Sequence, residues 1–200
     1  MNIHTQYKTI TREQFLFREM KIVAKLLLQD KSDEEIIQEV VQDNLFQYPT
    51  EKSLRNIGNV CLSRFHEVDS KEMIDLVANG QSDTAKQTCL FLMMNSYRLV
   101  WEFMIRVIGE KYRTHDDSIT KMDFNSFFTQ LQEQNEVVAG WSDATIYKCK
   151  QVLKRLLVEN GYLENSRSNE LKPVLLDLLL KQAIERTGNE EAFVAFNYFR

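Results

Sequence analysis

Hydrophobic residues recur along this chain mainly at spacings of three and four, the period of an amphipathic α-helix. Only two prolines and six glycines interrupt 200 residues, so few positions break a helix. The pattern therefore predicts an all-α fold. Helices are expected at 11–28, 32–43, 50–65, 82–112 with a bend near 95–96, and 142–160, and shorter ones end at 80, start at 120 and span 174–186.

Three sequences of the capping-box type support these helix starts. In such a box a Ser or Thr side chain accepts from the backbone three residues on, and the acid or amide there bonds back. The pairs are Thr11 with Gln14, Ser32 with Glu35, and Thr120 with the shorter acid Asp123. We therefore expect each of these hydroxyls to mark a helix N-terminus.

Residues 141–172 carry the most informative pattern. Ser142 is a good N-cap, and Gly161 can end the helix in the left-handed conformation. The apolar residues between them form one stripe: Ile146, Cys149, Val152, Leu153, Leu156 and Leu157. Helical spacing then places a second group on the opposite face, namely Tyr147, Lys148, Gln151, Lys154 and Arg155.

The segment after Gly161 reads as a short β-hairpin, with a polar turn at 165–169, Arg167 near its tip and Lys172 in its second arm. A cationic helix followed by a small basic hairpin is typical of a winged helix-turn-helix, which lies on duplex DNA. We therefore predict double-stranded DNA as a partner, bound mainly through phosphates.

The overall charge neither demands nor excludes this function. A formal net charge of −4 argues against a protein that coats nucleic acid by bulk charge. Residues 142–172 differ, with six Lys or Arg against four Asp or Glu. The alternative is a merely solvated helix face.

A second helix pair, 32–43 and 50–65, also has the helix-turn-helix pattern. The polar face of its second helix carries Lys52, Arg55, Asn56 and Asn59. Arg and Asn are suited to guanine and adenine edges. Any amphipathic helix has a polar outside, however, so a solvated face is the alternative here too.

The motif search favours a protein that is not an enzyme and needs no cofactor, metal or small-molecule substrate. The chain has no phosphate-binding glycine loop and no GxSxG nucleophile motif. His115-Asp116-Asp117 has too few companion ligands for a metal site. Cys61, Cys89 and Cys149 lie in apolar stripes, as reduced buried thiols do. The apolar runs are too short for a membrane, so we expect a soluble cytoplasmic protein.

We predict three segments: a helix-turn-helix bundle at 1–68, a central helical connector at 69–134, and a winged-helix-like domain at 135–200. The connector is rich in aromatic residues. These could form a base-stacking or protein-docking surface, but their helical spacing favours a core.

Four short motifs, in order along residues 11–180, give the chain a resemblance to the BrxA family of BREX (bacteriophage exclusion) systems. They are Asn44-Leu45-Phe46-Gln47-Tyr48; Tyr97-Arg98-Leu99 through Phe103 and Val107 to Lys111-Tyr112; Asp123-Phe124 with Phe127-Phe128; and Val138-Ala139-Gly140-Trp141-Ser142 through Gly161-Tyr162-Leu163.

This resemblance implies a helical DNA-binding accessory protein of phage defence, with other BREX proteins as partners and no catalytic residues. Two alternatives stay open: a protein-interaction scaffold within the BREX complex, and an RNA-binding protein similar to the helical antitermination factor NusB.

Overall fold

The computed structural model describes residues 6–12 and 14–199, and over them the fold is helical, as predicted. By internal packing the chain divides into two compact units. Unit 1 comprises Met1–Phe15, Tyr97–Leu176 and Asn189–Arg200, and unit 2 comprises Leu16–Ser96 and Asp177–Gly188. The predicted segments 1–68, 69–134 and 135–200 were drawn from motifs, and that division stays a prediction.

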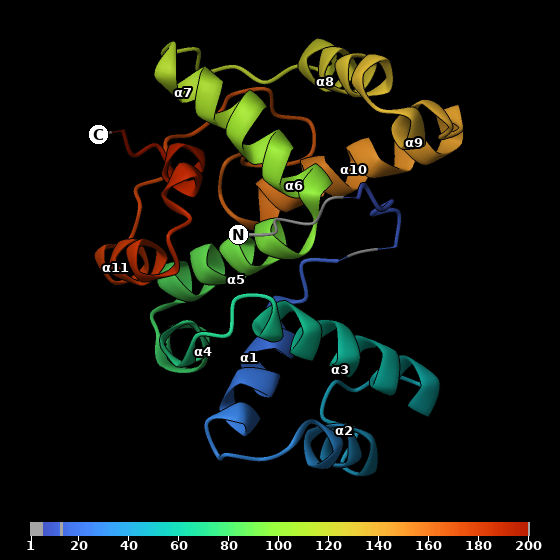
Figure 1. The fold of residues 1–200 in the computed structure, drawn as a ribbon, viewed down its shortest axis with the longest axis vertical. Helices are drawn as coiled ribbons and strands as arrows, with labels where there is room; N and C mark the ends of the chain where they lie inside the picture. Colours follow the sequence, from blue (N-terminus) through green and yellow to red (C-terminus); the bar gives the residue numbers. More distant parts are fainter. Residues whose placement is uncertain (1–5, 13, 200) are drawn as a thin grey trace. The chain divides into compact units, whose positions relative to one another are not determined.

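Unit 2 is built from helices whose starts follow from their caps (Figure 1). Ser32 and Glu35 form the predicted capping box, and Thr50 and Ser70 each accept a backbone N–H three residues on. The helices are α1 (Phe17–Leu27), α2 (Asp33–Gln42), α3 (Glu51–His66), α4 (Lys71–Asn79), α5 (Ser82–Ser96) and α11 (Leu178–Thr187).

The expected start of the first helix is wrong. The Thr11–Gln14 pair does not open it, because α1 begins at Phe17 after Leu16, which adopts a left-handed conformation with φ of 59°. Phe15 and Leu16 are both buried. Burial of these consecutive apolar residues outweighs the local capping preference, and Thr11, Arg12 and Gln14 are left outside any helix.

The long middle segment of unit 1 begins at Tyr97, where the predicted long helix breaks. Asn95 and Ser96 donate side-chain hydrogen bonds back to Phe91 and Leu92 carbonyls, and Tyr97 is extended with φ of −133°. Such back-bonding competes with the helical ladder. The elements that follow are α6 (Arg98–Phe103), the π-helix η1 (Met104–Gly109), α7 (Glu110–Arg113), α8 (Lys121–Gln134), α9 (Glu136–Ala139), α10 (Asp143–Glu159) and the 3₁₀ helix η2 (Glu190–Phe196).

The predicted hairpin at 162–172 is not confirmed: over the described residues the structure contains no strand, only an isolated bridge between Ser118 and Glu170. One backbone bond, from the Lys172 N–H to the Tyr162 carbonyl (2.9 Å), joins the two arms. The second arm pairs instead with the connector before α8, where Ile119 and Leu171 donate to the carbonyls of Asn169 and Asp117, each at 2.7 Å.

The physical reason lies in the first arm. Tyr162 and Leu163 are both buried, although neighbours on a strand point to opposite faces. The Tyr162 hydroxyl donates to the Ala195 carbonyl at 2.9 Å, so this arm is held into the core of unit 1 rather than along a partner strand. Residues 162–172 therefore form a loop. The segment has the helices of the predicted winged helix but not its β-hairpin.

The aromatic residues of the middle segment, apart from the half-buried Tyr97, are core, as their spacing favoured. Trp101, Phe103 and Phe127 are at most 5% exposed, and the Phe103 ring lies 5.3 Å from that of Phe127. A stacking or docking surface made of these rings is thereby excluded. The three cysteines are buried and free of disulfides. In the described part of the chain, no helix has the length and apolar character needed to cross a membrane.

Candidate nucleic-acid interface

The helix pair α9–α10 presents the predicted cationic face. Asn135 caps α9, and the Ser142 hydroxyl accepts from the Thr145 N–H at 3.3 Å to open α10. The buried positions of α10 are Ile146, Cys149, Leu153, Leu156 and Leu157. Since the apolar stripe faces the core, the polar stripe predicted opposite it is turned to solvent.

This polar face has two edges. Tyr147, which is 62% exposed, lies seven residues from the half-buried Lys154. Lys148 lies seven residues from Arg155, and both are exposed, as is Gln151. At about 100° per residue, members of each pair lie about 20° apart around the helix axis, and the two pairs are about 100° from one another.

Ion pairs neutralise only part of the positive charge on the polar face of α10. The Arg155 Nε donates to Glu159 at 2.7 Å, within the same exposed helix. Lys148 and Lys154 form no ion pair with another described residue. Lys150 differs, since its Nζ donates to Asn125 at 2.8 Å and lies over the Phe128 ring, and burial and then Lys121 lower its pKa. Lys150 therefore contributes to the packing of α10 against α8.

The two predicted wing residues lie in the loop described above. Arg167 is exposed, and its backbone N–H donates to the Asn165 side chain at 2.9 Å in a tight polar turn. Lys172 is half-buried, with its Nζ 3.9 Å from Glu164. Neither sits on a β-hairpin; Arg167 is the more exposed of the two, and the Lys172 ammonium lies near the carboxylate of Glu164.

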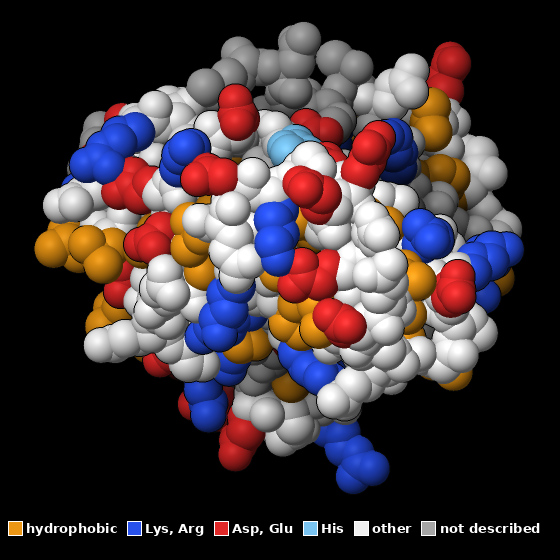
Figure 2. Space-filling model, turned by 90° about the horizontal axis from the view of Figure 1, so that it is seen from below, with side chains coloured by type: hydrophobic (Ala, Val, Ile, Leu, Met, Phe, Trp, Pro, Cys, Tyr) orange, Lys and Arg blue, Asp and Glu red, His pale blue; other side chains and the backbone are white. Residues whose placement is uncertain are grey.

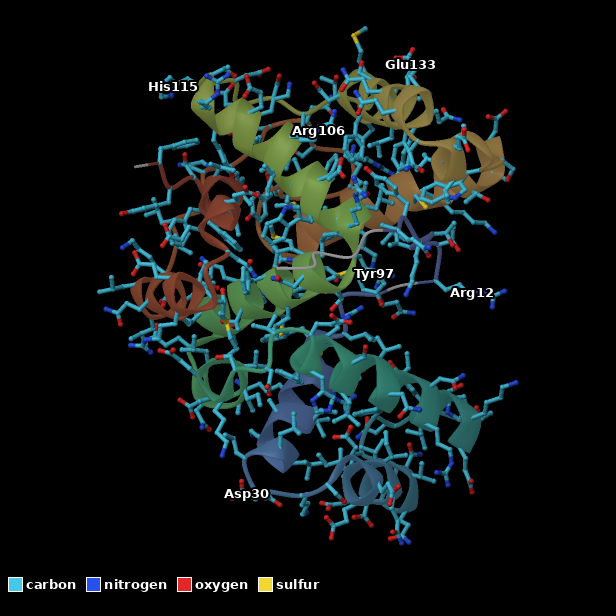
Figure 3. All side chains as sticks on the ribbon, in the orientation of Figure 1. Arg12, Asp30, Tyr97, Arg106, His115 and Glu133 are labelled. Atoms are coloured by element: carbon cyan, nitrogen blue, oxygen red, sulfur yellow. The ribbon has the colours of Figure 1, made fainter. Side chains whose placement is uncertain are left out.

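Part of the N-terminal segment lies beside α10, which the sequence did not predict. Thr11, Arg12 and Gln14 line a cleft of about 370 Å³ together with Lys148, Gln151, Val152 and Arg155. Figure 3 shows Arg12 on the N-terminal segment. Among the described residues that line this cleft, three are cationic and none is acidic.

Two other clefts have a different electrostatic character. One, between η1–α7 and α8, contains Lys111, whose Nζ bridges Asp116 and Asp123 at 2.7 Å each. Arg106, labelled in Figure 3, donates to Glu102 at 2.9 Å beside it. The second, on α2 and α3, contains the exposed pair of His66 and Asp33. Acids outnumber Lys and Arg among the described residues that line each of these clefts, so neither offers an excess of positive charge to an anion.

The candidate residues on α3 are exposed but mixed with acids. Lys52, Arg55, Asn56 and Asn59 all face solvent. The preceding helix α2, however, carries Asp33, Glu34, Glu35 and Glu39. Figure 2, seen from the side where α2 lies, shows acidic and basic side chains interspersed. This face lacks the excess of cations found among the described residues that line the α10 cleft.

No catalytic arrangement emerges from the described residues. In that part of the chain no group of three or more His, Cys, Asp or Glu side chains is placed to hold a metal ion. Burial raises the pKa of Cys61 to about 12, and it also raises that of Cys149 despite a hydrogen bond from the Ile10 backbone. Thiols so shifted are poor nucleophiles at neutral pH.

These features define a class: small all-α proteins that expose a cationic helix beside a cationic cleft. The BrxA family model matches residues 6–188, and the chain belongs to the BrxA family. It is 36% identical over 182 residues to the "BREX protein BrxA" of Bacillus cereus (strain H3081.97), covering 90% of each chain.

The chain is also similar to more distant proteins. The "BREX protein BrxA" of Escherichia coli O9:H4 (strain HS) is 24% identical, over 87% of this chain and 81% of that protein. The crystal structure of an uncharacterized protein from Magnetospirillum magneticum has a TM-score of 0.79 at 20% identity, covering 95% of this chain and 97% of that one. The second match shows a shared fold.

Proposed function

We propose that this protein is a non-catalytic, double-stranded DNA-binding accessory protein of a BREX phage-defence system, which contacts DNA mainly through phosphates. The main support for this proposal is the α10 face, where Lys148 and Arg155 are exposed and the opposite stripe is buried. Membership of the BrxA family supports the BREX context and other BREX proteins as partners.

Phosphate contacts are favoured over base recognition by the chemistry of the face. Its charged members are Lys and Arg on flexible stems, which meet a regular array of anions without reading sequence. Tyr147 and Gln151 are the only neutral side chains in the predicted set on α10 that could reach a base edge or sugar. Binding with little sequence preference and a steep salt dependence is therefore expected.

The test is a salt titration of binding with duplex DNA and with RNA of the same sequence. A first variant replaces Lys148, Lys154, Arg155 and Arg167 by Gln. A second replaces Lys52 and Arg55 by Gln and Asn56 and Asn59 by Ala, and its effect is compared per cation removed, since it loses two cations and the first loses four. Loss of up to four phosphate contacts removes about 3 to 4 units from the slope of log K against log salt. Circular dichroism checks the folding of both variants.

Four outcomes would count against the proposal or its assignment to α10. A salt slope unchanged in the α10 variant removes α10 and Arg167 as the DNA-binding element, and a larger effect of the α3 variant moves the interface to α3. Binding of RNA alone favours the NusB-like alternative. No binding of either nucleic acid favours the scaffold, for which Leu178 and Leu179, 65% and 54% exposed on α11, offer an apolar contact.

A further inference from the structure

The N-terminal segment of unit 1 is fixed against the helices that carry the candidate site. The Tyr7 hydroxyl donates to Glu102 on α6 at 2.5 Å, and Arg98 stacks 4.4 Å from the Tyr7 ring centroid. Ile10 is fully buried, and its backbone lies close enough to Cys149 on α10 to act on the pKa of that thiol. Arg12 follows two residues later, so its backbone is held near the polar face of α10.

The opposite wall of the cleft is a single stripe of α10. Lys148, Gln151, Val152 and Arg155 are offset by three, four and seven residues, so they lie along one side of the helix. The cleft volume of about 370 Å³ corresponds to roughly a dozen waters at about 30 Å³ each. A phosphate group fits in this space and can still remain partly hydrated.

The lining chemistry suits an anion. Arg12, Lys148 and Arg155 are charged donors, and Gln151 and Thr11 add neutral ones. Arg155 bonds Glu159 through Nε, which leaves the terminal nitrogens of its guanidinium for a second acceptor. Counting Glu159 against the three cations, the described residues leave an excess of two positive charges at this cleft.

We propose that Arg12, Lys148 and Arg155 form a seat for one backbone phosphate of the bound duplex, with Arg12 supplied by the N-terminal segment. The seat rests on the proposed function and assigns Arg12 a binding role. It also divides the α10 face: the Lys148–Arg155 edge contacts the DNA backbone, and the Tyr147–Lys154 edge, about 100° away, is left for the groove.

The test compares Arg12→Gln with Lys8→Gln, both in the otherwise intact chain. Lys8 is an exposed cation on the same segment that does not line the cleft, so it controls for general charge. Because Lys148 and Arg155 remain, Arg12→Gln should lower the salt slope by up to about 0.9 and weaken duplex binding by up to about eightfold at about 0.1 M salt. The effect should be equal for unrelated duplex sequences, and Lys8→Gln should resemble the parent.

The possible results of this comparison lead to different conclusions about the seat and about the proposed function. If Arg12→Gln binds as the parent does, the seat is refuted and the proposed function survives. If Lys8→Gln loses as much as Arg12→Gln, the attraction is delocalised, and the seat is refuted as well. If the parent fails to bind duplex DNA, the proposed function fails, and the seat is decided by a second measurement.

That second measurement is a titration with inorganic phosphate, followed by the backbone amide chemical shifts of the parent and Arg12→Gln. Saturable shifts confined to residues 11–14 and 148–155 in the parent, and lost in the variant, support an anion seat independently of DNA. Shifts that are absent, or equal in both proteins, overturn it.

Discussion

The anchor of the N-terminal segment offers a sharp test through Tyr7→Phe. This substitution removes a hydroxyl that donates to Glu102 at 2.5 Å and keeps the ring that Arg98 covers. A hydrogen bond to a charged group contributes about 1.5–3 kcal/mol. Because Arg98 still donates to the same carboxylate oxygen at 2.7 Å, that oxygen keeps a partner. We therefore expect the lower end, a loss of about 1.5–2 kcal/mol.

The measurement is urea-induced unfolding of the parent, Tyr7→Phe, Glu102→Gln and the double variant. The expected loss corresponds to a fall in melting temperature of about 3–8 °C for a protein of this length. The double-mutant cycle should give a coupling of at least about 1 kcal/mol, since groups in direct contact are not additive. A Tyr7→Phe effect within about 0.5 kcal/mol of zero, or an additive cycle, would refute the anchor.

The same anchor predicts a pH dependence. Burial alone would raise the pKa of Glu102, but hydrogen bonds from Tyr7, Arg98 and Arg106 outweigh it and hold the pKa below its usual value. A lowered carboxyl pKa contributes stability above the unfolded-state pKa, and that contribution is lost as pH falls through the folded-state value. The difference in stability between the parent and Tyr7→Phe should therefore narrow in acid and stay constant near neutral pH.

Three further predictions test other parts of the structure. Cys61 should react with a thiol reagent only after unfolding, because burial raises its pKa to about 12, and fast labelling of the native protein would contradict this. Ser142→Ala should cost about 1 kcal/mol in urea unfolding by removing the α10 cap, and a neutral result would show the cap to be dispensable. A Cβ at Gly109 would lie 2.6 Å from a Val194 methyl, so Gly109→Ala should cost about 1–3 kcal/mol, and combining it with Val194→Ala should relieve that cost.

The sequence determined the features that depend on neighbours along the chain. Caps at Ser32, Thr120 and Ser142 depend on contacts three residues away, so they were predicted and are present. The same holds for α10, where a buried stripe at helical spacing places Lys148 and Arg155 on the outside. Local periodicity is sufficient here because a helix closes its own hydrogen bonds.

Only the tertiary structure decided the features that depend on distant partners. The hairpin expected at 162–172 is a loop because its arms bond to residues 117–119 and to Ala195, and no local pattern announces those partners. Thr11 and Gln14 have the sequence of a helix start, yet burial of the following apolar residues leaves them lining a cleft. Arg12 comes beside α10 because Tyr7 is hydrogen-bonded to Glu102 on α6 and the fully buried Ile10 lies by Cys149 on α10, a placement set by long-range packing that sequence spacing does not encode.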